Sequence, residues 1–154
     1  KKQYSLFSRK QFSIRADVTL NHFRYGSFIR GTENLSGKVM PSVPSATISL
    51  TGNFQLKNGL YLNTSYYGAS AIFLNDANTA SARPYHLLGV QFGWRKKETG
   101  KTRLTIYAGA DNILDEVYSL GNDINAAAGR YYNAAPRRNY YIGVAFRLVT
   151  PRKK

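Results

Sequence analysis

Apolar residues alternate with small or polar residues along the segment from Tyr140 to Leu148. The apolar row consists of Tyr140, Ile142, Val144, Phe146 and Leu148. Because successive side chains of a β-strand point to opposite faces, the segment is expected to form a strand with one apolar face. The same alternation recurs along the chain and constrains the whole fold. We expect strands at residues 12–28, 46–56, 60–73, 85–95, 102–112 and 140–148.

The length of these segments matters as much as their period. A tilted strand needs roughly 9–11 residues to cross a bilayer, and the alternating rows are close to that length. The row that starts at Phe12 changes register near Asn21, which indicates a bulge or a strand end there.

The connections between the expected strands alternate between long and short. Polar stretches at 30–45, 75–83 and 115–138 are long, whereas Lys57–Gly59 and Lys96–Lys101 are short. Membrane barrels have tight turns at one rim and long loops at the other. We therefore predict an all-β fold, an antiparallel up-and-down transmembrane β-barrel segment of about six strands that forms a single region over residues 1–154. Because the smallest closed membrane barrels have about eight strands, we expect the chain to be part of a larger barrel.

Composition excludes several classes of site. The chain has no cysteine, and its two histidines, His22 and His86, lie far apart in sequence. It has no apolar run of about 18 residues, so no transmembrane helix is expected. No catalytic motif is present, and we predict no enzyme activity, no cofactor and no metal. The net charge of +14 suggests anionic partners.

Several motifs near the end of the chain resemble one family. Asp111-Asn112-Ile113-Leu114-Asp115 is followed by Tyr118, and Ala135-Pro136-Arg137-Arg138 precedes a last strand that ends at Leu148. Residues 34–37, 41–44, 57–60 and 75–79 fit the same pattern upstream. Over roughly residues 12–148 the chain resembles the C-terminal end of TonB-dependent outer-membrane receptors.

The resemblance implies a location and a role. Receptors of this family are barrels of about 22 strands that carry an N-terminal plug and import a scarce solute, often a ferric siderophore. The expected location is the bacterial outer membrane. The expected partners are outer-membrane lipid and lipopolysaccharide, the plug and remaining strands, an inner-membrane energy-transducing protein that contacts the missing part, and the ferric chelate; no nucleic acid is expected. The plug and the energy-coupling segment do not fit in this chain, and Val149–Lys154 extends past the family's usual end.

Three sets of residues are candidates for a role. The last long loop contains the expected ligand-contact group, in which arginines suit anionic solutes and tyrosines supply rigid contact area: Arg130, Tyr131, Tyr132, Arg137 and Arg138. Arg137 and Arg138 could instead anchor lipopolysaccharide or the hairpin. A strand-to-loop turn, preferred over a calcium site, is expected at Asp111, Asn112 and Asp115. The apolar row of the closing strand is expected to face lipid: Tyr140, Ile142, Val144, Phe146 and Leu148.

The polar rows leave alternatives open. Arg15, Arg103 and Arg147, together with several tyrosines, form either a wall that contacts a plug or an anionic solute, or a solvated surface. One alternative for the whole chain is a small self-contained outer-membrane barrel with a structural or adhesive role. Another is a soluble basic β-domain that binds nucleic acid through charges and tyrosines on one face.

Overall fold

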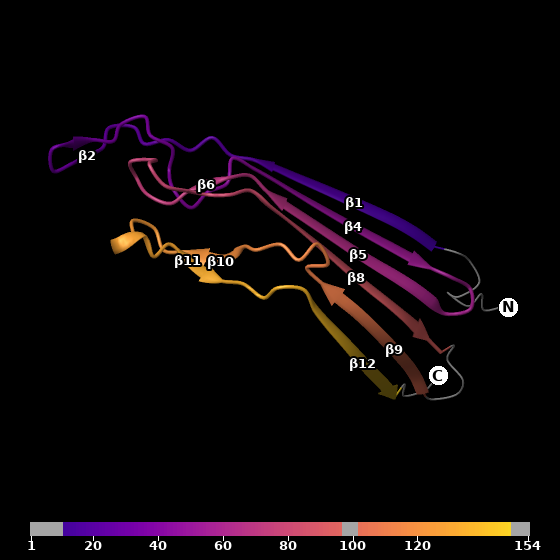
Figure 1. Cartoon of the computed structure of the whole chain (residues 1–154). Coiled ribbons are helices and arrows are strands. Elements are labelled where there is room, and N and C mark those ends of the chain that lie inside the picture. The colour runs from indigo at the N-terminus through magenta and orange to yellow at the C-terminus, as the bar shows by residue number, and fades with distance from the viewer. Residues whose placement is uncertain (1–10, 97–101, 149–154) are drawn as a thin grey trace.

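Six long strands form one antiparallel sheet (Figure 1). The structure, a computed structural model, describes residues 11–96 and 102–148. The strands lie in the order β1 (Gln11–Leu20), β4 (Ala46–Gln55), β5 (Leu60–Ala69), β8 (Tyr85–Arg95), β9 (Thr102–Asp111) and β12 (Asn139–Leu148). The prediction of an all-β fold with six antiparallel strands is confirmed. The sheet is open, with β1 and β12 as its two edges.

The strand register gathers the alternating rows onto two faces. One continuous row crosses all six strands on the same face: Phe12, Phe54, Leu62, Phe92, Ala108 and Ile142. The neighbouring row lies on the opposite face: Ser13, Asn53, Asn63, Gln91, Gly109 and Tyr141. Because directly paired residues share a face of the sheet, one side is mainly apolar, with Thr64 and His86 among its residues, and the other is mainly polar. We call these sides the apolar face and the polar face.

The apolar face is not covered by any described segment. Leu20 at one edge is 78% exposed and Ile142 at the other is 79% exposed. The buried hydrophobic residues of the described chain lie elsewhere: Leu35 and Leu74 in the connections, Tyr61 and Ala69 on the polar face. The sheet therefore has no core of its own on its apolar side.

Three long connections lie together at one end of the sheet (Figure 1). Residues 21–45 contain β2 (Ile29–Arg30) and β3 (Glu33–Asn34), and residues 70–84 contain β6 (Ile72–Phe73) and β7 (Ser81–Ala82). Residues 112–138 contain β10 (Ser119–Asn122), a short 3-10 helix (Ala127–Gly129) and β11 (Tyr132–Ala134). We call these three connections the loop layer. At the other end, which we call the short-turn end, Gly59 with its φ of 90° closes the tight turn between β4 and β5.

Two strand boundaries differ from the prediction. The first strand ends at Leu20 rather than at residue 28, because the chain turns away and Arg24 pairs with Val39 within its own connection. The expected strand 60–73 divides into β5 and β6, and β6 pairs with β7 instead of with the sheet. The other four strands agree with the expected bounds to within one residue. The basic stretches at 1–10, 97–101 and 149–154 lie outside the described residues.

Candidate functional site

One buried carboxylate, Asp76, joins the three connections of the loop layer. It is 7% exposed and accepts hydrogen bonds from the Tyr25 hydroxyl at 2.7 Å and from Arg30 Nη1 at 2.9 Å. From the third connection, Asn125 Nδ2 donates to the same carboxylate at 2.8 Å. The Asp76 N–H donates in return to Asn125 Oδ1 at 3.0 Å. A buried carboxylate with this many donors is well satisfied, and it fixes segments about 50 residues apart in sequence.

A second set of contacts packs the loop layer further. The Asn78 amide accepts from Val39 N and donates to Val39 O, both at 2.8 Å, as a strand neighbour would. Leu74, which is 1% exposed, receives the Asn125 N–H on its carbonyl at 2.9 Å. The hydrogen bond to Asp76 raises the pKa of Tyr25 above its ordinary value. The layer is therefore one packed unit rather than three independent loops.

Asn112 holds the base of the last connection. Its Oδ1 accepts the Glu116 N–H at 2.9 Å, and its Nδ2 donates to Glu116 O at 2.9 Å and to Pro136 O at 3.3 Å. Asn112 has a φ of 49°, a left-handed conformation that asparagine tolerates well. Asp111, the last residue of β9, is the register partner of Asn139 in β12. These contacts close residues 112–138 onto the start of the last strand.

Asp115 and Arg137 form a bidentate ion pair at the same base. Arg137 Nη2 and Nε lie 2.6 and 3.0 Å from the two carboxylate oxygens, and the Arg138 N–H donates to Asp115 at 3.2 Å. The Arg137 guanidinium, followed by the Arg138 amide, lowers the pKa of Asp115 to about 2. Of the two roles expected for Arg137, its side chain therefore has the one within the hairpin, through Asp115.

The structure places the five expected ligand-contact residues in two locations. Arg130 and Tyr131 lie between the 3-10 helix and β11, and Tyr132 begins β11, where its hydroxyl donates to Ser81 O at 3.4 Å. Arg137 and Arg138 lie at the base, against Asp115. Tyr132 is 60% exposed, so its side chain is accessible to a solute.

The Asp76 cluster was missed by sequence reasoning. Asp76 lies in an Asn- and Thr-rich stretch, and its partners are 46 to 51 residues distant. No periodic pattern connects residues at such separations. The only available signal was an isolated acidic residue in a polar loop, which is commonplace on protein surfaces.

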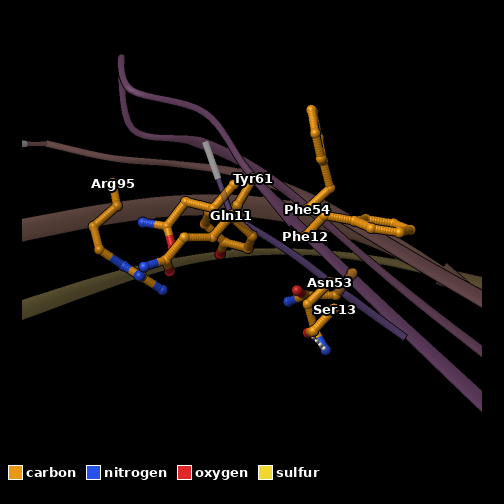
Figure 2. A pocket seen from close by; sticks show the side chains of 9 residues that line it. Gln11, Phe12, Ser13, Asn53, Phe54, Tyr61 and Arg95 are labelled. Carbon is orange, nitrogen blue, oxygen red and sulfur yellow. Dashed lines mark hydrogen bonds between the residues drawn. The ribbon is translucent and has the colours of Figure 1, made fainter. Parts of the chain in front are cut away.

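A second candidate site lies on the polar face at the short-turn end. A hollow of about 700 Å³ is lined there by Gln11, Ser13, Asn53, Gln55, Tyr61, Asn63 and Arg95, with Phe12 and Phe54 at its margin. In Figure 2 the rings of Phe12 and Phe54 point away from the side chains of Ser13 and Asn53. The Arg95 guanidinium carbon lies 5.1 Å from the centroid of the Tyr61 ring, within the range of a cation–π contact.

Tyrosines of the polar face lie across glycines of the neighbouring strand. Tyr61 covers Gly93, Tyr141 covers Gly109 and Tyr107 covers Gly143, each pair being direct register partners. A methyl group at any of these glycines would clash with the ring. Tyr107 and Tyr141 also contact each other edge-on, with centroids 6.3 Å apart. These three tyrosine rings therefore cover glycines of the neighbouring strands.

No protein-family model matches the chain. Within residues 11–96 and 102–148, no helix has the length and apolar composition that crossing a membrane requires. The same residues contain no group of three side chains placed to hold a metal ion. The assignment of a function therefore depends on the geometry of the sheet and of the loop layer.

Proposed function

We propose that the chain forms the closing part of a transmembrane β-barrel of the TonB-dependent receptor type, which takes up a scarce solute such as a ferric siderophore across the bacterial outer membrane. The observation that carries this proposal is the uncovered apolar face formed by six strands in register. The five described apolar residues of the closing strand are each at least 66% exposed: Tyr140, Ile142, Val144, Phe146 and Leu148.

An apolar face of this extent is unfavourable in water and favourable in a bilayer. Exposure costs roughly 25 cal/mol per Å² of apolar surface, and soluble proteins rarely leave large contiguous apolar patches uncovered. The six strands have 10 or 11 residues each. A tilted strand needs about 9–11 residues to cross the hydrocarbon layer. Face and length together support a membrane-spanning sheet.

The aromatic residues at both ends of the apolar face also support a membrane-spanning sheet. Trp94 lies near the short-turn end, where its Nε1 donates to Asn58 O at 3.1 Å. Tyr140 lies near the loop layer and is 74% exposed. Tryptophan and tyrosine are enriched where barrel walls meet the lipid headgroups.

The open edges support a larger barrel. β1 and β12 each present one side without a neighbouring strand among the described residues. Unpaired backbone groups cost several kcal/mol each in hydrocarbon, so a membrane sheet must close. In a barrel of about 22 strands, most strands would come from residues outside this chain. A small self-contained barrel would instead need at least two strands more than the six of the described sheet.

The parts of the chain take distinct roles in this proposal. The closing strand contacts outer-membrane lipid, and Arg138, just before its start, contacts lipopolysaccharide. The loop layer forms part of the vestibule, where Arg130, Tyr131 and Tyr132 contact the ferric chelate. The plug fills the space beside the polar face, and the inner-membrane energy-transducing protein contacts the receptor outside this chain. The chain is neither an enzyme nor a nucleic-acid-binding domain.

Insertion into vesicles of a neutral phosphatidylcholine tests the proposal. Because the two open edges need pairing in hydrocarbon, we expect the chain to remain with the vesicles after carbonate washing as assemblies of several copies rather than as a monomer. A monomer that inserts alone and shows a heat-dependent shift in gel mobility would favour the small self-contained barrel instead. A Val144→Asp, Phe146→Asp double variant should insert poorly, because both charges would face hydrocarbon. The matched Ala145→Asp variant carries its charge on the polar face and should insert as the parent does. A chain that stays monomeric and folded in buffer without detergent would contradict the proposal.

A further inference from the structure

Three arginines of the described strands lie at the short-turn end of the polar face. Arg95, Arg103 and Arg147 lie there on β8, β9 and β12, and the register makes Arg103 and Arg147 direct partners. The carboxylates on the polar face of the described strands, Asp17 and Asp111, lie closer to the loop layer. Asp17 is already paired with Arg15 at 2.8 Å. Charge complementarity therefore favours an anionic partner at the short-turn end.

The spacing of the arginines suits a partner longer than a simple anion. β8 and β12 are separated by β9, which places Arg95 and Arg147 about 10 Å apart across the sheet. Arg95 is also turned toward β5, because its guanidinium lies over the Tyr61 ring. An extended chain advances about 3.3 Å per residue, so acidic groups three or four residues apart would reach both arginines.

The lining of the adjoining hollow fits a polypeptide. Besides Arg95, it is lined by the side-chain amides of Gln11, Asn53, Gln55 and Asn63. An amide side chain both donates and accepts hydrogen bonds, as a peptide group does. The Asn53 amide donates to Ser13 Oγ at 3.4 Å and the Asn63 amide to Gln91 Oε1 at 3.1 Å, so each retains further bonding capacity. The hollow of about 700 Å³ has room for several residues of such a chain.

The three tyrosines that cover glycines on the polar face are poorly placed for nucleic acid. Single-stranded nucleic acid binds by stacking its bases on exposed aromatic faces. The Tyr61 ring lies against Gly93 and also has the Arg95 guanidinium carbon 5.1 Å from its centroid. Tyr107 and Tyr141 lie over glycines and against each other. The geometry therefore favours a peptide over an oligonucleotide.

We infer that the short-turn end of the polar face binds an extended acidic polypeptide segment, with Arg95 and Arg147 pairing with carboxylates three or four residues apart. Arg103 adds positive charge between them. This inference deepens the proposed function, since it rests on the polar face being turned away from lipid. It specifies the chemistry of the filling segment: acidic side chains where it meets β8 to β12.

Fluorescence anisotropy with labelled peptides tests the inference on the full chain in a nonionic detergent. The probes are a twelve-residue Asp-Ser-Gly repeat, the corresponding Asn-Ser-Gly repeat, and oligo-dT. We expect the Asp repeat to bind, the Asn repeat to bind about tenfold or more weakly, and affinity for the Asp repeat to fall as salt rises from about 50 to about 300 mM. The Arg95→Gln, Arg147→Gln double variant should lose about tenfold in affinity for the Asp repeat.

The controls separate charge from folding. Arg83→Gln removes one exposed arginine in the loop layer and should leave peptide affinity unchanged. The double Arg→Lys variant should retain most of the salt-dependent affinity, which a misfolded chain would not. Equal binding of the Asp and Asn repeats, or unchanged binding in the double Arg→Gln variant, would overturn the inference. If oligo-dT bound more tightly than the Asp repeat and lost that binding in the same variant, the partner of this surface would be a nucleic acid and the inference would be overturned. A chain that inserts into vesicles but does not bind the Asp repeat overturns this inference alone, whereas failure to insert counts against the proposed function.

Discussion

Asp76 is the residue on which the loop layer depends most. Its carboxylate accepts from two donors in residues 21–45 and from one in residues 112–138, and Asp76 is almost fully buried. Removing one partner of a buried hydrogen-bonded group leaves the others unsatisfied, which costs more than the bond itself contributes. The three connections are therefore expected to open together rather than one at a time.

Asp76→Ala tests this coupling. We expect the local stability of the loop layer to fall by about 2 kcal/mol, which corresponds to roughly 30-fold faster amide exchange. Hydrogen exchange read by mass spectrometry should show residues 21–45, 70–84 and 112–138 accelerating together. Glu33→Gln is the matched control, because Glu33 also pairs with Arg30 but is 58% exposed. Its effect should stay within about 0.5 kcal/mol. Acceleration confined to 70–84 would show that the connections are independent.

The ion pair at Asp115 predicts a pH dependence. The pKa of this carboxyl falls from 3.8 to about 2 when Arg137 and Arg138 bind it. Because the folded-state pKa is the lower one, the contact stabilises the fold fully above the unfolded value and loses its effect as pH falls toward 2. Nuclear magnetic resonance of the Arg138 amide should report the loss of its hydrogen bond to Asp115 as the pH falls from about 4 to about 2. In an Asp115→Asn variant this transition should be absent, and its persistence would assign it to another group.

At the scale of elements, the tyrosine–glycine pairs fix how neighbouring strands lie against each other. Tyr107 of β9 covers Gly143 of β12, and Tyr141 of β12 covers Gly109 of β9. Each of the last two strands thus places a tyrosine ring over a glycine of the other strand, on the polar face. Glycine is required at these positions because the ring occupies the space that a Cβ would need.

Gly109→Ala should destabilise the β9–β12 hairpin. The added methyl group meets the Tyr141 ring and the Val90 carbonyl, and overpacking of this kind costs about 1–3 kcal/mol. Denaturant unfolding in detergent should show a lower midpoint, and a Tyr141→Ser background should reduce the loss. Gly26→Ala is the control, since nothing lies within 4 Å of the added group and its φ is not positive. Equal midpoints for Gly109→Ala and Gly26→Ala would contradict the steric explanation.

The strands could be predicted from the sequence more fully than the connections. Two-residue alternation is a local property, so the extents of β4, β8, β9 and β12 follow from it closely. β1 and β5 are shorter than predicted because their neighbours in the loop layer take over the pairing of Arg24 and Ile72. The Asp76 cluster and the tyrosine–glycine pairs depend on cross-strand register and distant partners. Register is a property of the assembled sheet and could not be predicted from one strand at a time.

At the scale of the molecule, one sheet separates two environments. Its apolar face has no covering layer in the described chain, and its polar face carries arginines, amides and tyrosines. The loop layer is packed around its own buried residues, Leu35 and Leu74, and so does not depend on the sheet for a core. The central claim is that the apolar face contacts hydrocarbon while the polar face contacts water or a filling segment.

Quenching of tryptophan fluorescence by brominated lipids tests this claim most directly. The chain has one tryptophan, so Trp94→Phe gives a silent background for a single reporter on β12. In vesicles with bromine deep in the acyl chains, Val144→Trp should be strongly quenched and blue-shifted, since Val144 lies on the apolar face and is 67% exposed. Ala145→Trp, one residue further on the polar face, should be quenched little. Equal quenching at the two positions, or none at either in chains that bind the vesicles, would contradict the account.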